Sequence, residues 1–280
     1  THPLVRAMLI TSTRAVPGAH VDLLSDYDVI LVVADLMPFV EDRSWLEDFG
    51  EPLIVYWDSV QPDPEHNIDT CGNVTQYASG LKIDFTLWPV ALCERIAEAR
   101  SLPDELDAGY RVLLDKDDLT AQLLPPTYAA YIPKLPTQGA YELHVNDFLT
   151  DPPYVAKCLW RDELLPAKWC LDQDMKQTYL RPVLEWYIEI AHGWSVPVGY
   201  LGKGLKAHLP SDIWSRLEAT YVGADLAGNW EALYGTLSLF HDVAAEVGQH
   251  LGYPYPETLH QHVVDYVRYI QQLPYPVDAY

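Results

Sequence analysis

The proline pair at residues 125–126 separates two stretches of this chain that have different hydrophobic periodicities. Before it, apolar residues occur in short runs of strand length, interrupted by helical patches. After it, longer segments carry leucine, alanine and tryptophan at the spacing of amphipathic helices. A chain of 280 residues is long enough for two domains. The sequence therefore predicts an α+β fold, with a mixed-sheet domain over residues 1–125 and an all-helical domain over residues 126–280.

The expected elements follow from these patterns. In the first domain we expect strands at residues 5–10, 26–34, 53–57, 73–79, 81–88 and 111–115, and helices at 44–50 and 89–100. In the second we expect helices at residues 154–171, 178–193, 211–221, 229–252 and 256–273. Pro166 and Pro182 are expected to kink or divide their helices.

The charge balance argues against two classes of partner. The chain has 18 basic and 40 acidic residues, a formal charge of -22, which repels nucleic acid and anionic membranes and attracts polycations. No apolar run approaches the roughly 20 residues of a membrane helix, and residues 1–30 lack a leader pattern. We therefore expect a cytoplasmic protein that binds neither nucleic acid nor membranes. Acidity that serves solubility alone is the alternative.

Two aspartates stand at the start of the second expected strand, in SDYDVILVV. Side chains two apart on a strand point to the same face, so Asp26 and Asp28 project together. Carboxylates this close repel each other unless something neutralises them. Mg²⁺ does this well, because it binds through one or two carboxylates and keeps other positions for water and phosphates. A solvated strand edge is the alternative.

A third carboxylate follows in LKIDFTLW. Asp84 alternates with Ile83 and Phe85, so it faces the opposite way from them. Lys82 lies beside it on the same face. On a strand next to the first pair, Asp84 would complete a site for metal-assisted phosphoryl or nucleotidyl transfer.

A hydroxyl-rich turn, TSTR, follows the first expected strand. Ser12 and Thr13 can present hydroxyl and N–H groups to phosphate oxygens there, and Arg14 can add charge-assisted bonds. An ordinary capping turn is the alternative. A strand, a small polar turn and a strand with two aspartates are the parts with which a nucleotidyltransferase domain holds Mg²⁺ and a triphosphate.

These segments resemble the aminoglycoside 6-adenylyltransferases, also called streptomycin adenylyltransferases, of the DNA polymerase β nucleotidyltransferase superfamily. TSTR stands where the family has a Gly-Ser-Arg turn, and SDYDVILVV stands where it has an Asp-Phe-Asp strand. Further matches continue in the family's order, including LKIDFTLWP, YVAKCLWRDEL, SVPVGYLGK and NWEALYGTLSLFHDVAAEVGQHLGYPYPE. The resemblance covers nearly the whole chain.

The resemblance implies a reaction. It is the Mg²⁺-dependent transfer of AMP from ATP to a hydroxyl of a cationic aminoglycoside such as streptomycin, with release of pyrophosphate, which confers antibiotic resistance. Asp26, Asp28 and Asp84 are implied to be the catalytic carboxylates that hold Mg²⁺. A monomer or a homodimer is expected.

It also implies further site residues. Thr13 replaces the family serine at a phosphate contact, with Ser12 and Arg14 on either side. Lys157 and Lys203 fall at matching lysine positions and would neutralise the triphosphate. A sugar hydroxyl needs a general base. Our candidate for this base is Asp147, which stands at a family glutamate, and Asp84 is the competing candidate. Carboxylates that would bind a polycationic acceptor include Glu142, Glu185 and Glu189.

Two departures from the family pattern affect this site. Ser12 stands at the family glycine, where a side chain would crowd an approaching phosphate. Residues 149–153, LTDPP, replace an aromatic pair, and their prolines must break any helix that crosses them. Two alternatives therefore stay open: a transferase with a different hydroxylated acceptor, and an inactive relative that binds a nucleotide or another small molecule.

Overall fold

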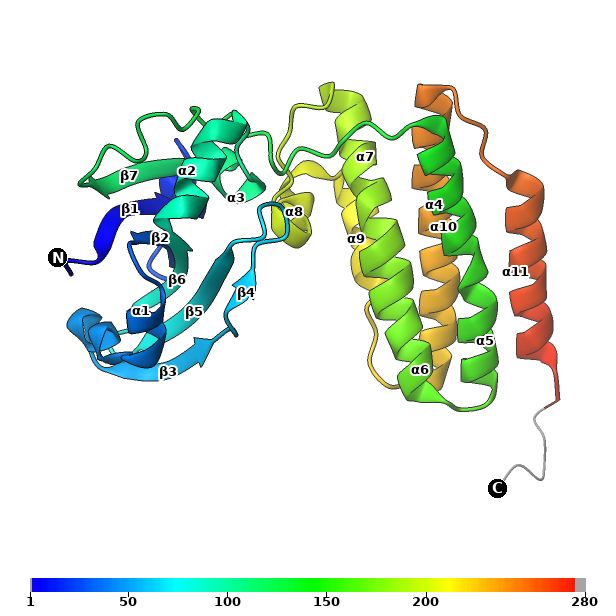
Figure 1. Ribbon diagram of the computed structural model, residues 1–280. Coiled ribbons are helices and arrows are strands. Elements are labelled where there is room, and N and C mark those ends of the chain that lie inside the picture. The colour runs from blue at the N-terminus through cyan, green and yellow to red at the C-terminus, as the bar shows by residue number, and fades with distance from the viewer. Residues whose placement is uncertain (1, 275–280) are drawn as a thin grey trace. The chain divides into compact units, whose positions relative to one another are not determined.

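The structure is a computed structural model that describes residues 2–274 and divides into two compact units, residues 1–131 and 132–280 (Figure 1). The first unit holds a seven-stranded mixed sheet with short helices, and the second is helical. The α+β class predicted from the sequence is therefore confirmed. Within residues 2–274, no helix has the length and apolar character needed to cross a bilayer.

The sheet of the first unit has the strand order β3-β5-β6-β2-β1-β7, with β4 paired to β5. Its strands are β1 (Val5–Thr11), β2 (Tyr27–Val33), β3 (Pro52–Trp57), β4 (Gln61–Pro62), β5 (Asp69–Tyr77), β6 (Lys82–Pro89) and β7 (Tyr110–Asp115). The short helices are η1 (Ser12–Ala15), α1 (Met37–Glu41), η2 (Ser44–Phe49), α2 (Val90–Ala99) and α3 (Asp104–Asp107). Among the pairings of the described strands, only β2 with β6 is parallel.

Strand β2 is buried on both faces because it lies between two apolar clusters. Val29, Leu31 and Val33 pack into the cluster that contains residues of α1 and η2. Ile30 and Val32 pack into the cluster that contains residues of α2. The strand alternates between the clusters because successive side chains point to opposite faces. By the same alternation, Asp28 belongs to the face that α2 covers further along the strand.

The second unit consists of helices around one apolar core. They are α4 (Gln138–Thr150), α5 (Pro152–Trp160), α6 (Leu164–Lys168), the π-helix η3 (Trp169–Leu180), α7 (Arg181–His192), η4 (Tyr200–Gly202), α8 (Leu205–His208), α9 (Ser211–Ala219), α10 (Leu226–Leu251) and α11 (Glu257–Gln272). Helix α10 contributes a buried stripe at helical spacing. Aromatic stacking joins α4 to α10, where Phe148 lies on Phe240 with ring centroids 3.5 Å apart.

Two of the expected helix divisions were placed wrongly. The helix expected over residues 154–171 ends at Trp160, and Asp162 has a left-handed φ of 60°. Pro166 lies in the first turn of the next helix, where a missing N–H is tolerated. Pro182 divides nothing, because the helical backbone is continuous over residues 164–192 and wide π turns precede the proline. The break expected at residues 149–153 is confirmed, since α4 ends before Pro152.

We expect Phe240→Ala to lower the free energy of unfolding of the helical unit by about 3–5 kcal/mol, because it leaves a cavity against a fully buried ring. Denaturant unfolding followed by far-UV circular dichroism measures this change. Leu143→Ala, at a 61% exposed position on α4, is the control and should change stability by less than about 0.5 kcal/mol. Equal losses in the two variants would contradict the assignment of this core.

Candidate active site

The register of two neighbouring strands brings the predicted carboxylates of the first unit together. In the parallel pairing of β2 with β6, Asp28 stands opposite Asp84. On the other side of β2, Thr11 at the end of β1 stands opposite Asp28. Asp26 lies just before β2, two residues from Asp28 and on the same face. The three aspartates predicted to act together are therefore neighbours at one end of the sheet.

A lysine lies among these carboxylates. The Lys82 Nζ atom donates to Asp26 Oδ2 at 2.6 Å and to Asp84 Oδ2 at 2.9 Å. The side chain is 29% exposed, so both ion pairs are partly shielded from water. Sequence reasoning placed Lys82 beside Asp84 but gave it no role. The signal that could have revealed one was its position two residues before Asp84 on the same strand face.

The environment of Asp28 disfavours its ionised form. Burial raises its pKa above the ordinary value, and the charges of Asp84 and Asp26 raise it further. A hydrogen bond from the Ser12 hydroxyl and the charge of Lys82 act in the opposite direction but do not cancel the rise. A divalent cation at this position would relieve the repulsion among the three aspartates.

The oxygen atoms of this cluster fit a hard cation such as Mg²⁺ in their chemistry. Carboxylate oxygens are the ligands that Mg²⁺ takes from proteins. Asp84 Oδ1 is buried and has no hydrogen-bond partner, an arrangement that is costly unless a ligand satisfies it. The candidate ligand oxygens of these three carboxylates do not all lie within 4.8 Å of one another. Lys82 Nζ lies between two of them.

The turn after β1 has an unusual backbone. Ser12 has a φ of 58°, in the left-handed region that favours glycine. Its side chain is directed to Asp28, to which its hydroxyl donates a hydrogen bond. Thr13, the next residue, is exposed at the surface. Thr13 is thus the residue of this turn whose hydroxyl is open to a ligand.

Arg14 is held by the backbone that leads into β2. Its Nε donates to the Asp26 carbonyl at 2.9 Å, and a terminal guanidinium nitrogen donates to the Ser25 carbonyl at 2.7 Å. The guanidinium also lies 3.8 Å from the centre of the Tyr27 ring. These contacts fix the segment that carries Asp26.

Comparison with known proteins assigns this arrangement to a family. A family model described as streptomycin adenylyltransferase matches residues 1–270. The chain belongs to the streptomycin adenylyltransferase family. It is therefore a nucleotidyltransferase, and the resemblance seen in the sequence is confirmed.

Individual relatives of this family are similar over most of their length. An aminoglycoside 6-adenylyltransferase of Campylobacter jejuni is 28% identical over 260 residues, which cover 91% of this chain and 86% of the relative. One from Bacillus subtilis (strain 168) is 29% identical over 257 residues, 90% of this chain and 87% of the relative. The crystal structure of an aminoglycoside 6-adenyltransferase from Bacillus subtilis aligns with 98% of this chain and 94% of its own, with 24% identity and a TM-score of 0.47.

The other predicted site residues of this family member belong to the helical unit. Asp147 is half-buried on α4. Lys157 is exposed on α5, with Nζ 5.8 Å from the centre of the Tyr266 ring. Lys203 is exposed directly after η4, in a turn where Leu201 has a left-handed φ of 52°. Asp147 and Lys157 thus lie on different helices of that unit, and Lys203 lies in the turn between η4 and α8.

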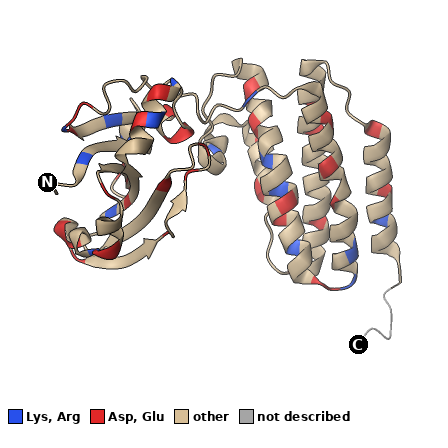
Figure 2. Cartoon of the chain, viewed as in Figure 1, with Lys and Arg blue, Asp and Glu red and all other residues tan. Residues whose placement is uncertain are grey.

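The acidic residues expected to attract a cationic acceptor differ in their surroundings. Acidic residues occur on many elements of both units (Figure 2). Glu189 is fully buried and accepts hydrogen bonds from the backbone N–H groups of Ser195 and Val196, so it holds a turn instead of lining a cleft. Glu185 forms an ion pair with Arg181. The sequence named Glu189 as a candidate without placing it, because periodicity alone does not reveal a buried polar contact.

A second acidic group was missed in the sequence. Oxygen atoms of Asp151 and Asp174 and the Cys170 Sγ atom lie within 4.8 Å of one another. Burial raises the pKa of Asp151 to about 6, and the charges of Asp174 and Asp147 add to the rise. Asp151 belongs to the LTDPP segment that departs from the family. The residues are dispersed in sequence, so only the packing of α4, α5 and η3 brings them together.

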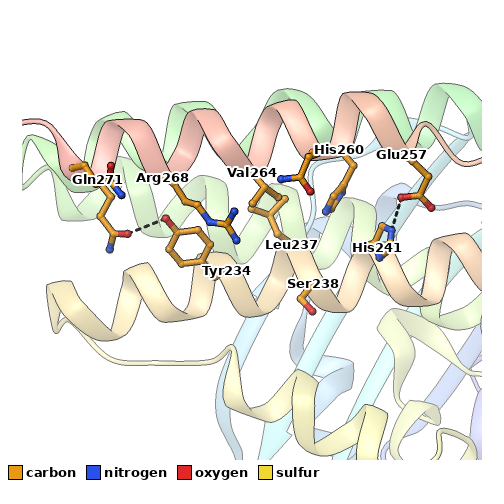
Figure 3. A pocket seen from close by; sticks show the side chains of 11 residues that line it. Tyr234, Leu237, Ser238, His241, Glu257, His260, Val264, Arg268 and Gln271 are labelled. Atoms are coloured by element: carbon orange, nitrogen blue, oxygen red, sulfur yellow. Dashed lines mark hydrogen bonds and ion pairs between the residues drawn. The ribbon is translucent and has the colours of Figure 1, made fainter.

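The helical unit also contains a cavity of about 780 Å³ along α10 and α11 (Figure 3). His241 Nε2 lies 2.8 Å from a Glu257 oxygen, and the Tyr234 hydroxyl donates to Gln271. Burial opposes the charged form of His241, but hydrogen bonds with Asp242 and Glu257 outweigh it and raise its pKa. None of the predicted site residues lines this cavity.

The Ser12 turn offers a test of backbone strain. Ser12→Ala and Ser12→Gly both lose the hydroxyl bond to Asp28, but only glycine relaxes the left-handed backbone. We expect the glycine variant to be the more stable of the two by about 1 kcal/mol, as measured by denaturant unfolding. Equal stabilities would show that the turn is unstrained.

The raised pKa of Asp151 predicts how the stability of the protein depends on pH. A carboxyl whose pKa is raised on folding destabilises the native state when it is ionised, so Asp151→Asn should stabilise the protein above the folded pKa of about 6. Because the group is only partly buried, solvent screening reduces the expected gain at about pH 8 to roughly 1–2 kcal/mol. At about pH 4, where the native carboxyl is protonated, the gain should disappear.

Thermal unfolding at the two pH values measures this difference. Glu231→Gln, at an exposed position on α10, is the control that removes one carboxylate charge without changing a buried group. A gain for Asp151→Asn that is the same at both pH values would contradict the raised pKa.

Proposed function

We propose that this protein transfers AMP from ATP to a hydroxyl of an aminoglycoside such as streptomycin, in a Mg²⁺-dependent reaction in the cytoplasm that releases pyrophosphate. The observation that carries the proposal is the β2–β6 register, which sets Asp28 beside Asp84 in a member of this family. The relatives from Campylobacter jejuni and Bacillus subtilis, named aminoglycoside 6-adenylyltransferases, support the choice of donor and acceptor.

The first unit supplies the residues for the nucleotide. Asp26 and Asp28 would hold Mg²⁺, with Asp84 as the third ligand. When bound, the ion would neutralise charge on the triphosphate and fix its orientation. The exposed Thr13 hydroxyl would donate to a phosphate oxygen. Arg14 would act indirectly, because its bonds to the Ser25 and Asp26 carbonyls hold the segment that carries the first carboxylate.

The bonds that change in the reaction can be stated. The acceptor oxygen forms a bond to the α-phosphorus of ATP while the bond from that phosphorus to the pyrophosphate oxygen breaks. The hydroxyl proton passes to a carboxylate. Asp147 is our first candidate for this base, and Asp84 is the second, supported by its buried, unpartnered Oδ1 atom. The pyrophosphate gains negative charge when its bond to the α-phosphorus breaks. The exposed side chains of Lys157 and Lys203 would neutralise this charge.

The acceptor is proposed to bind the helical unit as a polycation. The net charge of -22 favours its approach at long range. At short range, the charges of Asp147 and Asp174 already raise the pKa of Asp151, so this neighbourhood disfavours further negative charge and favours an ammonium group. Asp151 and Asp174 are our candidates for contacts with the amines of the acceptor, beside the candidate base Asp147.

The reaction is tested by measuring pyrophosphate release with ATP, Mg²⁺ and a panel of aminoglycosides. We expect release that depends on streptomycin, and we expect Asp28→Asn to reduce it more than about 100-fold, since even outer-shell changes at metal sites cost about 10–100-fold. Asp48→Asn, at an exposed position in η2, is the matched control and should retain activity.

Two outcomes would contradict parts of the proposal. Full activity of Asp28→Asn would remove the carboxylate cluster from the mechanism. Background release with every aminoglycoside and related aminocyclitol, while calorimetry shows normal binding of ATP and Mg²⁺, would show that the acceptor is a different hydroxylated molecule.

A further inference from the structure

Lys82 lies among the carboxylates of the cluster and forms ion pairs with two of them. It begins β6, two residues before Asp84 and on the same face, and it reaches across to the residue before β2. Its ammonium is bonded to one oxygen of Asp26 and to one oxygen of Asp84. These are two of the three carboxylates that the proposed function assigns to Mg²⁺.

The remaining oxygens of the cluster show what Lys82 leaves unsatisfied. Asp84 Oδ1 is buried without a partner. Asp28 accepts a bond from Ser12 and forms no ion pair with Lys82 among the contacts of the described residues. A single ammonium group therefore bridges two carboxylates but balances the charge of only one of them, and a third, half-buried carboxylate lies beside the pair. The cluster still favours additional positive charge.

A divalent cation and the lysine cannot both bind the two carboxylate oxygens that Lys82 contacts. Asp26 Oδ2 and Asp84 Oδ2 are already bonded to Nζ at 2.6 and 2.9 Å. An ion bound by the same atoms would bring two like charges within a few ångströms of each other, where repulsion is strong in a partly buried site. Binding of the ion through Asp26 Oδ2 and Asp84 Oδ2 therefore requires the ammonium to move away.

We propose that Lys82 is an internal counter-ion of this site, which holds Asp26 and Asp84 in place without metal and is displaced when a divalent cation binds. The inference rests on the metal requirement of the proposed function. Lys82 is a positioning residue: it keeps the carboxylates from repelling each other apart, and its competition lowers the affinity for the ion. Metal binding is thereby coupled to a movement of the Lys82 side chain.

The test compares Mn²⁺ binding by the wild-type protein and Lys82→Gln without nucleotide, using electron paramagnetic resonance to measure the free ion. We expect Lys82→Gln to bind Mn²⁺ about tenfold more tightly, because a competing charge has been removed. We also expect it to have a lower Tm without metal and a larger rise in Tm when Mn²⁺ is added. Lys82→Arg keeps the charge and should restore weak binding.

Lys116→Gln is the control for the loss of one positive charge elsewhere in the same unit, where the Lys116 ammonium donates to the His2 carbonyl. Its Mn²⁺ affinity should match that of the wild type. A second measurement follows the ammonium signal of Lys82 by ¹⁵N NMR, assigned by its absence in Lys82→Arg. Added Mg²⁺ should shift this signal and leave that of Lys116 in place.

The outcomes separate this inference from the proposed function. If the wild type binds Mn²⁺ and Lys82→Gln binds it equally or more weakly, Lys82 is not a competitor and the inference is overturned, while the metal site stands. If neither protein binds Mn²⁺, the metal requirement fails and the inference fails with it. A Lys82 signal that does not respond to saturating Mg²⁺ would overturn the displacement step.

Discussion

The candidate site depends on the parallel pairing of β2 with β6. The chain leaves β2, builds the β3 and β5 extension of the sheet, and returns alongside the strand it left. The return register sets Asp84 beside Asp28. A slip of one residue would turn every side chain of β6 to the opposite face and remove Asp84 from the cluster. The two apolar clusters that flank β2 oppose such a slip, because it would expose Phe85 and bury the charged residues of β6.

The site combines several unfavourable local features. A half-buried carboxylate stands among like charges at Asp28, an oxygen of Asp84 is buried without a partner, and Ser12 has a left-handed backbone. Each of these lowers stability, and such features gather where a protein binds or transforms a ligand. The β2–β6 pairing has no register shift, and β2 is packed between two apolar clusters, so this part of the sheet can hold the strained residues in place. A carboxylate cluster at a strand end therefore indicates a ligand site when neighbouring residues are also held in unfavourable conformations or environments.

Part of the carboxylate cluster could be predicted from the sequence. Alternation along a strand predicted that Asp26 and Asp28 share a face and that Asp84 opposes Ile83 and Phe85. It could not predict that β6 pairs with β2, because strand order depends on packing between distant segments. For the same reason, the sequence could not predict the ion pairs of Lys82 with Asp26 and Asp84 or the proximity of Asp151 to Asp174. The helix break before Pro152 was predictable from proline chemistry, whereas the break at Asp162 carries no such local signal.

The cysteines have a practical consequence. All four are buried and free, with Cys71 and Cys93 in the sheet unit and Cys158 and Cys170 in the helical unit. Burial raises the pKa of Cys93 to about 11 and of Cys170 to about 12, so almost no thiolate is present at neutral pH. An alkylating reagent can reach these sulfur atoms only when the surrounding structure opens. Each unit thus contains its own pair of chemical reporters, and their labelling rates would record the opening of the two units separately in a single sample.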